Sequence, residues 1–282
     1  MAILSIQSAV AYGSVGNAAA VFPLQRLGFE VWRVDTVLFS NHTGYGAWRG
    51  TVFDPKLVGG IIQGIEERGV LPRCEAVLSG YLGSVELGAA VLDAVKRVKH
   101  ANPKALYCCD PVLGDADRGF FVRPELADFY REAVAVTDIL TPNRFEFETL
   151  AGFRIDTVAA TQAACDTLLS EGPSVILVTS YDVAEIATNT AAMLVATAEG
   201  GWLVRTPRLP MVANGAGDLT AALFLGHFLR TKAAAAALAE TTSAVHAVIA
   251  ETLRLGAVEL AIAAAQEALV SPPHRFPVER LF

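Results

Sequence analysis

Hydrophobic and polar positions alternate between two patterns along the chain. Short apolar runs, typical of buried strands, are separated by longer segments whose apolar residues recur at helical spacing. The runs predict strands over residues 2–6, 31–37, 76–78, 105–109, 138–140 and 175–178. A helix predicted over 54–68 opens with Asp54-Pro55, an N-cap followed by proline at the first helical position, and one over 84–100 opens with a capping Ser84.

This order of elements predicts an α/β protein. Strands separated by helices need right-handed crossovers, which build a mostly parallel central sheet with helices on both faces. Residues 191–205 instead predict two strands joined by Glu199-Gly200-Gly201, a small edge hairpin. The chain then turns helical over 219–269. Because neither a repeat nor a Pro/Ser-rich linker interrupts the sequence, we expect one domain over residues 1–282.

The composition narrows the classes of partner. Of the 282 residues, 53% are hydrophobic and 18% are charged, so the chain can bury a sizeable core and is a compact globular protein. The formal net charge is −7, and the sequence contains no basic run. This argues against nucleic acid or an anionic membrane surface as a main partner. A small molecule is the expected ligand.

Cysteine usage and the N-terminus indicate the compartment. Four cysteines do not make a disulfide scaffold in a chain of this length, and the adjacent pair Cys108-Cys109 matches no zinc spacing. Residues 1–25 carry no charge, but polar residues and glycines break the stretch, which fits neither an export signal nor a membrane span. We therefore expect a cytoplasmic protein.

Polar or glycine-rich stretches follow five of the predicted strands. In a parallel sheet, ligands collect at the carboxyl ends of the strands, so these stretches are candidate binding loops. They are residues 5–8, 40–45, 79–83, 110–115 and 141–143. A sixth stretch, Asn-Gly-Ala-Gly-Asp over 214–218, opens an apolar helix.

The sixth stretch is the most informative. Two glycines let the backbone come close to a ligand, and consecutive amides at a helix N-terminus favour a negative group such as phosphate. Asp218 would repel that phosphate, yet a base that takes a proton from an attacking hydroxyl would have to stand there. The alternative interpretation is a turn with a helix-capping aspartate.

Other common chemistries lack their signatures in this sequence. There is no Gly-Lys dipeptide and hence no Walker A loop, and Gly13 and Gly16 do not have the dinucleotide-binding spacing. Gly-x-Ser-x-Gly and His-Glu-x-x-His are also missing. The sequence therefore lacks the motifs of the common hydrolases and metalloproteases.

Acidic residues near two strand ends are candidate metal ligands. Asp110, Asp115 and Glu146 offer hard oxygens that suit Mg²⁺ held mainly through water and substrate phosphates. Two alternatives remain open: Asp-Pro is a common turn opener, and Asn143 with Glu146 makes a good capping box.

Four further residues have two interpretations each. Thr141 and Thr179 each end a predicted strand. Each is either a ligand-binding residue or an ordinary surface threonine. Tyr81 either stacks on a planar ring or packs on the sheet, and His42 fits a structural hydrogen-bonder better than a catalyst.

Six stretches occur in order between about residues 3 and 230 and cover most of the chain. They are SIQSAV through GAWRG (5–50), SGYLGS (79–84), DPVLGD (110–115), TPNRFEFETLAG (141–152), ILVTS (176–180) and NGAGDLTAALFLGHFL (214–229). Together they resemble the pyridoxal kinases of the ribokinase superfamily. The resemblance implies a ribokinase-like fold. It also implies ATP-dependent phosphorylation of the 5'-hydroxymethyl group of pyridoxal, and of pyridoxine or pyridoxamine.

The resemblance also implies roles for individual residues. Asp218 would be the base, and the amides facing the transferring phosphoryl group would come from Gly215, Ala216 and Gly217. The pyridine ring would be held by Ser8, Thr43, Gly44 and Tyr81. ATP would be bound by Asp110, Thr141, Asn143, Glu146, Thr179, Thr206, Pro207, Arg208 and Leu209. Mg²⁺ and a monovalent cation such as K⁺ would be held by Asp110, Asp115, Thr141, Glu146 and Thr179. A mobile lid and a homodimer are further expectations.

The sequence departs from the family pattern at several positions. Ala216 replaces the threonine of many relatives, but only its backbone is needed. Phe120 stands where some bacterial relatives have a cysteine, so covalent trapping of the aldehyde is not expected there. Thr179 replaces a lysine found in others, which bears on the monovalent cation. Related hydroxymethylpyrimidine kinases usually have cysteine in place of Asp218, which favours the pyridoxal branch. The alternatives to a pyridoxal kinase are a hydroxymethylpyrimidine kinase and a non-catalytic vitamin B6 binding protein.

Overall fold

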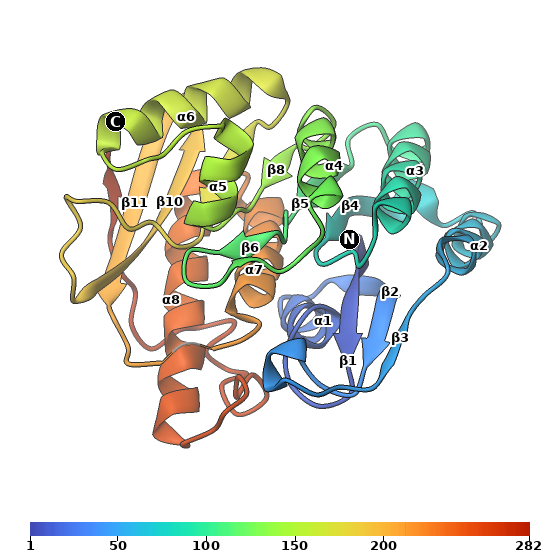
Figure 1. Ribbon diagram of the computed structural model, residues 1–282, viewed down its shortest axis with the longest axis horizontal. Helices are drawn as coiled ribbons and strands as arrows, with labels where there is room; N and C mark the ends of the chain where they lie inside the picture. Colours follow the sequence, from blue (N-terminus) through green and yellow to red (C-terminus); the bar gives the residue numbers. More distant parts are fainter. Residues whose placement is uncertain (212) are drawn as a thin grey trace.

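A mixed ten-stranded sheet runs through the computed structural model, which describes residues 1–211 and 213–282. Its strand order is β12-β11-β10-β9-β8-β5-β4-β1-β2-β3 (Figure 1). The central strands are parallel: β2 (Glu30–Phe39), β1 (Ala2–Val10), β4 (Cys74–Ser79), β5 (Leu106–Cys109), β8 (Ile139–Leu140) and β9 (Val175–Val178). Antiparallel strands flank them: β3 (Gly50–Val52), β10 (Thr190–Thr197), β11 (Gly200–Pro207) and β12 (Val278–Arg280).

Helices cover both faces of this sheet (Figure 1). On one face lie α1 (Asn17–Arg26), α7 (Ala216–Thr231) and α8 (Ala234–Arg254). On the other lie α2 (Pro55–Glu66), α3 (Val85–Ala101), α4 (Glu125–Val134), α5 (Arg144–Ala151) and α6 (Val158–Glu171). Each layer buries its own apolar cluster against the sheet, which confirms the predicted α/β class.

The two helix starts that the sequence signalled are confirmed. Asp54 caps α2, with its Oδ1 accepting from the N–H of Lys56 at 2.8 Å. Ser84 caps α3 and accepts from the N–H of Leu87 at 3.2 Å. These side chains satisfy amides that a helix start leaves unpaired, which is why the boundaries could be predicted.

The predicted hairpin is formed by β10 and β11, which pair antiparallel from Thr190↔Pro207 to Thr197↔Gly200. Outside it, β12 pairs with β11, so that Trp202 lies opposite Arg280. This short strand adds a further edge that the sequence did not predict. Two small elements complete the connections near the strand ends: the 3₁₀ turn η1 (Thr43–Tyr45) and the ribbon of β6 (Gly114–Asp115) and β7 (Gly119–Phe120).

The prediction of a helix through residue 269 is wrong beyond α8. Helix α8 ends at Arg254, and Gly256 follows with a left-handed φ of 62° that turns the chain away from the helix axis. Residues 262–270 then form a series of turns. Leu260, Ile262 and Leu269 are buried in the segment after α8, so their apolar spacing reflects packing and not a helix.

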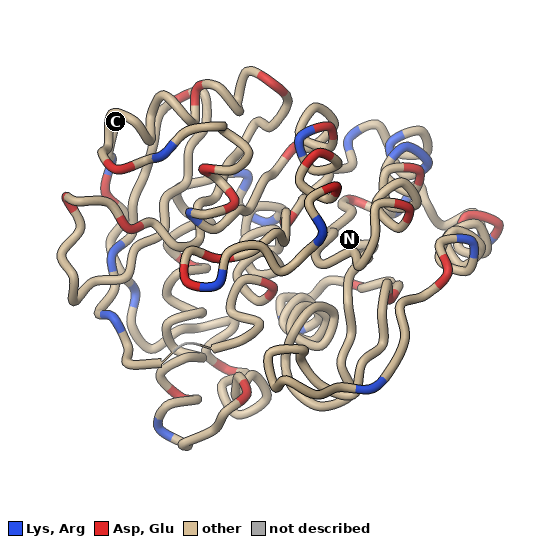
Figure 2. Tube along the Cα trace, viewed as in Figure 1, with Lys and Arg blue, Asp and Glu red and all other residues tan. Residues whose placement is uncertain are grey.

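Charged side chains are interspersed along the chain. Short blue and red segments are scattered along a mostly tan trace in Figure 2. Arg97, for example, pairs with both Asp93 and Glu66. Within the described residues, no helix combines the length and apolar character needed to cross a bilayer.

Candidate active site

A cavity of about 1060 Å³ lies at the carboxyl ends of the parallel strands and at the start of α7. Every predicted site residue lines it except Thr141. In sequence order, the lining contains Ser8, Thr43, Gly44, Tyr81, Asp110, Asp115, Asn143, Glu146, Thr179, Thr206, Pro207, Arg208 and Leu209, together with Gly215, Ala216, Gly217 and Asp218 from the start of α7. Loops far apart in sequence therefore converge on one space.

Thr141 lies beside the cavity but does not face it. Its side chain is buried, and its Oγ1 is 3.5 Å from the carbonyl oxygen of Cys109. It also hydrogen-bonds the carboxyl group of Asp110. Thr141 thus contacts a cavity residue instead of the cavity itself.

The first turn of α7 stands very close to the turn over residues 12–16. Gly215 has a left-handed φ of 83°, and a Cβ built on it would lie 1.7 Å from the carbonyl oxygen of Ser14. Only glycine fits this position. Helix hydrogen bonding begins at once, because Leu219 donates its N–H to the Gly215 carbonyl oxygen at 2.9 Å. Gly215, Ala216 and Gly217 thus bring their backbone to the cavity wall, where the N–H of Ala216 makes a long hydrogen bond of 3.3 Å to the carbonyl oxygen of Ala213.

Asp218 combines a cavity position with an altered titration. Burial raises the pKa of Asp218 to about 6, although hydrogen bonds from the N–H groups of Gly16 and of Asp218 itself act to lower the pKa. The carboxylate is thus mostly ionised at neutral pH yet far more basic than an ordinary aspartate. This is the tuning expected of a general base.

The end of the cavity near β1 is partly apolar. Val10, Val15 and Phe39 form a small cluster against which Tyr81 packs, and these side chains line the cavity. Ser8 adds a hydroxyl at an irregularity of β1, where the pairing with β2 shifts register between Gln7 and Ala9. An aromatic and aliphatic wall with one polar group suits a flat ring that carries polar substituents.

The loop after β2 contributes Thr43 and Gly44 to the same end. His42 caps η1, with its Nδ1 accepting from the N–H of Gly44 at 3.2 Å. Burial and the nearby Arg118 lower the pKa of His42. His42 thus makes a hydrogen bond that shapes the loop and also lines the cavity.

Buried carboxyl groups occupy the middle of the cavity. Burial raises the pKa of Asp110 well above its ordinary value, and the carboxylates of Glu146 and Asp218 raise it further. Burial also raises the pKa of Glu146 to about 7, even though its oxygens accept from the N–H groups of Asn143 and Leu113, each at 2.9 Å. Glu146 thus makes the predicted capping box and also lines the cavity.

Asp115 is engaged differently from the other two carboxylates. It accepts from Nη2 of Arg118 at 2.7 Å and from the Arg118 N–H at 2.7 Å. Burial alone would raise the pKa of Asp115, but these interactions outweigh it and lower the pKa. A metal ion would have to compete with Arg118 for this carboxylate.

The carboxylates in the cavity fit a metal ion that is also coordinated by water and by substrate phosphates. No cluster of three or more His, Cys, Asp or Glu side chains within residues 1–211 and 213–282 could hold a metal alone. The pKa of Asp110 is raised by burial and by the neighbouring carboxylates of Glu146 and Asp218, so negative groups gather at this point of the cavity. Mg²⁺ prefers such a site, where one or two carboxylates, water and substrate phosphates share the coordination.

The opposite end of the cavity lies at the exit of β11. Arg208 is fixed there by its N–H, which donates to Asn189 at 2.9 Å, and by its Nε, which donates to the carbonyl oxygen of Thr188 at 3.0 Å. Its guanidinium lies 3.7 Å from Asp182. A polyanionic ligand could compete with Asp182 for the guanidinium of Arg208, because the two side chains are 3.7 Å apart.

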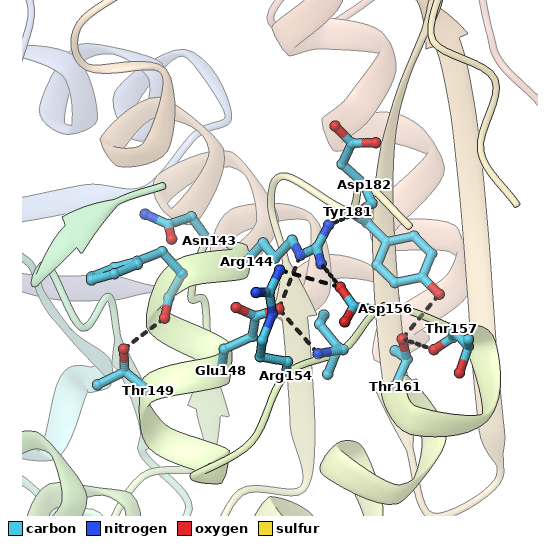
Figure 3. A network of polar contacts seen from close by, with 12 residues as sticks. Asn143, Arg144, Glu148, Thr149, Arg154, Asp156, Thr157, Thr161, Tyr181 and Asp182 are labelled. Atoms are coloured by element: carbon cyan, nitrogen blue, oxygen red, sulfur yellow. Dashed lines mark hydrogen bonds and ion pairs between the residues drawn. The ribbon is translucent and has the colours of Figure 1, made fainter. Parts of the chain in front are cut away.

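A polar network anchors the loop after β9, which also lines this end (Figure 3). Arg144 donates to Glu148 at 3.1 Å, to Asp156 at 2.8 Å and to the carbonyl oxygen of Asp182. The hydroxyl of Tyr181 lies 3.1 Å from that of Thr161 on α6. The loop that carries Thr179 is therefore held firmly against α5 and α6.

Sequence reasoning missed several lining residues. One face of α8 contributes Thr242, Val245, His246 and Ile249, whose apolar helical spacing looked like ordinary core. The ribbon of β6 and β7 contributes Arg118, which carried no signal of its own. The N–H of Gly16 holds Asp218, and the paired glycines near the N-terminus were the available hint.

Comparison with known proteins defines the class. The family model described as phosphomethylpyrimidine kinase matches residues 67–263, and the chain belongs to this family. A full-length relative, pyridoxal kinase PdxY of Rubrobacter xylanophilus, is 58% identical over 99% of this chain and 97% of that protein. Pyridoxal kinase PdxY of Deinococcus radiodurans is 52% identical over 99% and 96%. Within the family, the chain therefore groups with the pyridoxal kinases.

Solved structures agree with this grouping. Pyridoxal kinase from Leishmania donovani in complex with ADP and ginkgotoxin superposes with a TM-score of 0.92 at 28% identity, covering 99% of both chains. The same protein in complex with ADP and pyridoxine gives 0.92 at 27% identity, covering 99% of this chain and 98% of that one. The ribokinase-like fold that the sequence motifs predicted is confirmed.

Proposed function

We propose that this chain transfers the γ-phosphoryl group of ATP to the 5'-hydroxymethyl group of pyridoxal. The observation that carries the proposal is the position of Asp218, which shares one cavity with Ser8 and Thr43 and stands at the glycine turn that opens α7. The full-length relatives named pyridoxal kinase support the same substrate pair.

The chemistry assigned to these residues is a direct transfer. Asp218 takes the proton of the hydroxymethyl group, whose oxygen forms a bond to the γ-phosphorus as the bond to the bridging oxygen of ADP breaks. Backbone N–H groups of Gly215, Ala216 and Gly217 face the negative charge of the phosphoryl group. Ser8, Thr43, Gly44 and Tyr81 hold the ring, so that the reacting oxygen points at Asp218.

The nucleotide and its cations occupy the rest of the cavity. Thr206, Pro207, Arg208 and Leu209 lie along ATP, and Thr179 and Asn143 approach its phosphates. Asp110 and Glu146, together with Asp115 once Arg118 releases it, would hold Mg²⁺, which would neutralise phosphate charge. Thr179 would hold a monovalent cation such as K⁺, and Thr141 would position Asp110 from behind. The raised pKa values of Asp110 and Glu146 support a cationic occupant between them.

We also propose a cytoplasmic homodimer that acts on small molecules. Cys74, Cys108, Cys109 and Cys165 are all free and buried, which suits a reducing compartment. Exposed apolar side chains on neighbouring elements, Leu38 on β2, Val52 on β3 and Leu57 and Ile61 on α2, could be covered by a second copy. Light scattering of the purified protein tests the dimer.

A second candidate substrate is hydroxymethylpyrimidine, because the matching family model bears the description phosphomethylpyrimidine kinase. Coupled ADP-release assays with pyridoxal, pyridoxine, pyridoxamine and hydroxymethylpyrimidine separate the two. We expect the highest kcat/KM among the B6 vitamers. Preference for hydroxymethylpyrimidine would reassign the substrate, and binding of pyridoxal without any ADP release would instead make the chain a binding protein.

A further inference from the structure

Glu259 lies outside the cavity lining yet joins two of the loops that form the cavity. Its Oε1 accepts a hydrogen bond from the hydroxyl of Tyr45 at 2.6 Å, and its Oε2 accepts from the backbone N–H of Ser14 at 3.0 Å. Glu259 comes from the segment after α8, which reaches the loop over residues 41–46 near the lower edge of the molecule in Figure 1. One carboxylate thus connects three segments that are remote in sequence.

Both partners of Glu259 are immediate neighbours of residues proposed to act on the substrate. Tyr45 follows Thr43 and Gly44 in the 3₁₀ turn that lines the ring-binding end. Ser14 presents its carbonyl oxygen to the glycine at the start of α7, where a Cβ would lie 1.7 Å away. A displacement of either loop would therefore move the wall around the acceptor or the turn that faces the phosphoryl group.

The backbone around Glu259 is fixed by its own contacts. Leu260 is buried in the apolar layer beside α8, and its carbonyl oxygen accepts from the hydroxyl of Ser14 at 3.2 Å. The next N–H, that of Ala261, donates to Oγ1 of Thr252 at 2.9 Å. Gly13 leaves the space that the carboxylate needs, because a Cβ there would lie 2.6 Å from Oε2 of Glu259. Glu259 is thus a fixed point to which the two loops are attached.

The two hydrogen bonds are of the stronger kind. Both place a neutral donor on a carboxylate, and such charge-assisted bonds are shorter and stronger than those between neutral groups. The bond to Glu259 raises the pKa of Tyr45 to about 12, which keeps the phenol protonated as the donor. Beside it, the rings of Tyr12 and Tyr45 lie 6.2 Å apart.

We propose that Glu259 is a positioning residue for the phosphoryl transfer, which holds the loop over residues 41–46 closed against the turn over residues 12–16 above the acceptor. The inference rests on the proposed function. With the loops held together, water is kept from the acceptor end of the cavity, and the hydroxymethyl group is held toward Asp218. Without Glu259, the acceptor end opens while the nucleotide end at β11 keeps its contacts.

The experiment compares Glu259→Ala, Glu259→Gln and Tyr45→Phe with the wild type. Glu259→Ala and Tyr45→Phe should each lower kcat/KM for pyridoxal by about tenfold, mainly through KM, the size expected for a lost hydrogen bond to a charged group. KM for ATP should not change. Glu259→Gln, which keeps an acceptor, should lie between Glu259→Ala and the wild type. The matched control is Glu267→Ala, an exposed carboxylate of the same segment that pairs with Arg26, and it should behave as wild type.

A double-variant cycle separates positioning from a general loss of structure. Glu259→Ala combined with Tyr45→Phe should be no more impaired than Glu259→Ala alone, since Glu259→Ala already removes the contact with Tyr45. ADP formed per phosphorylated product should also rise above one in these variants, because water can reach the phosphoryl group. A purely structural contact would change the melting temperature and leave KM and this ratio alone.

The inference is overturned if Glu259→Ala keeps the wild-type kcat/KM for pyridoxal, if KM for ATP rises to the same extent, or if the double variant is additively worse. Failure of the proposed function gives a different result, since the wild type itself would then form no phosphorylated pyridoxal. Thermal unfolding of each variant is recorded in parallel. Tyr45→Phe removes only a hydroxyl of a partly exposed residue, so it provides a folded variant even if Glu259→Ala unfolds.

Discussion

Asp218→Asn separates proton transfer from every other role of this position. Asparagine has nearly the shape of aspartate, and its side-chain oxygen can still accept the hydrogen bond from Gly16, but it cannot take a proton at neutral pH. We expect turnover to fall by about 10²–10⁴, the usual effect of losing a general base, with KM for pyridoxal nearly unchanged.

The pH dependence follows from the raised pKa of Asp218. With a pKa of about 6, roughly nine tenths of the wild-type enzyme has an ionised Asp218 at pH 7 and roughly one tenth at pH 5. The kcat/KM for pyridoxal should therefore fall about tenfold from its plateau when the pH is lowered to 5. The part of this acid limb that Asp218 contributes should be absent from Asp218→Asn, whereas protonation of the proposed Mg²⁺ ligands Asp110 and Glu146, whose pKa values are also raised, should still lower the residual activity at low pH.

The same shift has a consequence for stability. The pKa rises from 3.8 to about 6 on folding, roughly two units, so at pH 7 ionised Asp218 costs about 3 kcal/mol. The folded state binds more protons than the unfolded state between about pH 4 and pH 6, so stability falls as the pH rises through this window. Asparagine removes the cost and should raise Tm by about 5 °C at pH 7, with the gain shrinking toward pH 4.

ADP-release assays between pH 5 and 8 and calorimetric melting of the wild type and of Asp218→Asn provide these measurements. Two results would refute the reasoning: a turnover of Asp218→Asn close to wild type, or an acid limb in the variant as large as that of the wild type. Either would assign the proton transfer to another group. A variant less stable than wild type at pH 7 would contradict the burial argument for the pKa.

Three further predictions concern the rest of the cavity. Gly215→Ala should lose activity and about 1–3 kcal/mol of stability in denaturant unfolding, because its Cβ would meet Ser14; Gly217→Ala, with open space around its Cβ, should keep its stability. Arg208→Ala should raise KM for ATP about tenfold and leave KM for pyridoxal unchanged, whereas Arg205→Ala, whose partner is a carboxylate on β12, should change neither. Chelation of divalent ions should abolish turnover but not pyridoxal binding in calorimetry, and added Mg²⁺ should restore turnover.

The sequence predicted those parts of the fold that local signals determine. The caps at Asp54 and Ser84 and the apolar runs of the parallel strands need no knowledge of distant residues. The path after α8 could not be predicted in this way, because buried positions such as Leu260 and Leu269 have spacing compatible with a helix, while Gly256 redirects the chain. Packing, and not local preference, determines that segment.

In the candidate site, too, some residues could be predicted from local signals and others could not. Asp110, at the exit of β5, could be predicted because the carboxyl ends of parallel strands meet. Ser8 was also predicted, although β1 extends to Val10 and Ser8 lies within this strand. Arg118 and His246 could not, since one reaches the cavity from a small ribbon and the other from a helix that looked like core. Glu259 was also beyond prediction, because its partners are joined to it only by the folded chain.

The position of the phosphate on the product tests the central claim most directly. Pyridoxal offers a ring hydroxyl and the 5'-hydroxymethyl group, and the wild-type enzyme can be incubated with pyridoxal, ATP and Mg²⁺ before the product is analysed by phosphorus–proton correlation NMR. We predict one phosphorylated product, coupled through phosphorus to the 5'-methylene protons and equal in amount to the ADP formed. ADP without a phosphorylated vitamer, or phosphate on the ring hydroxyl, would contradict the account.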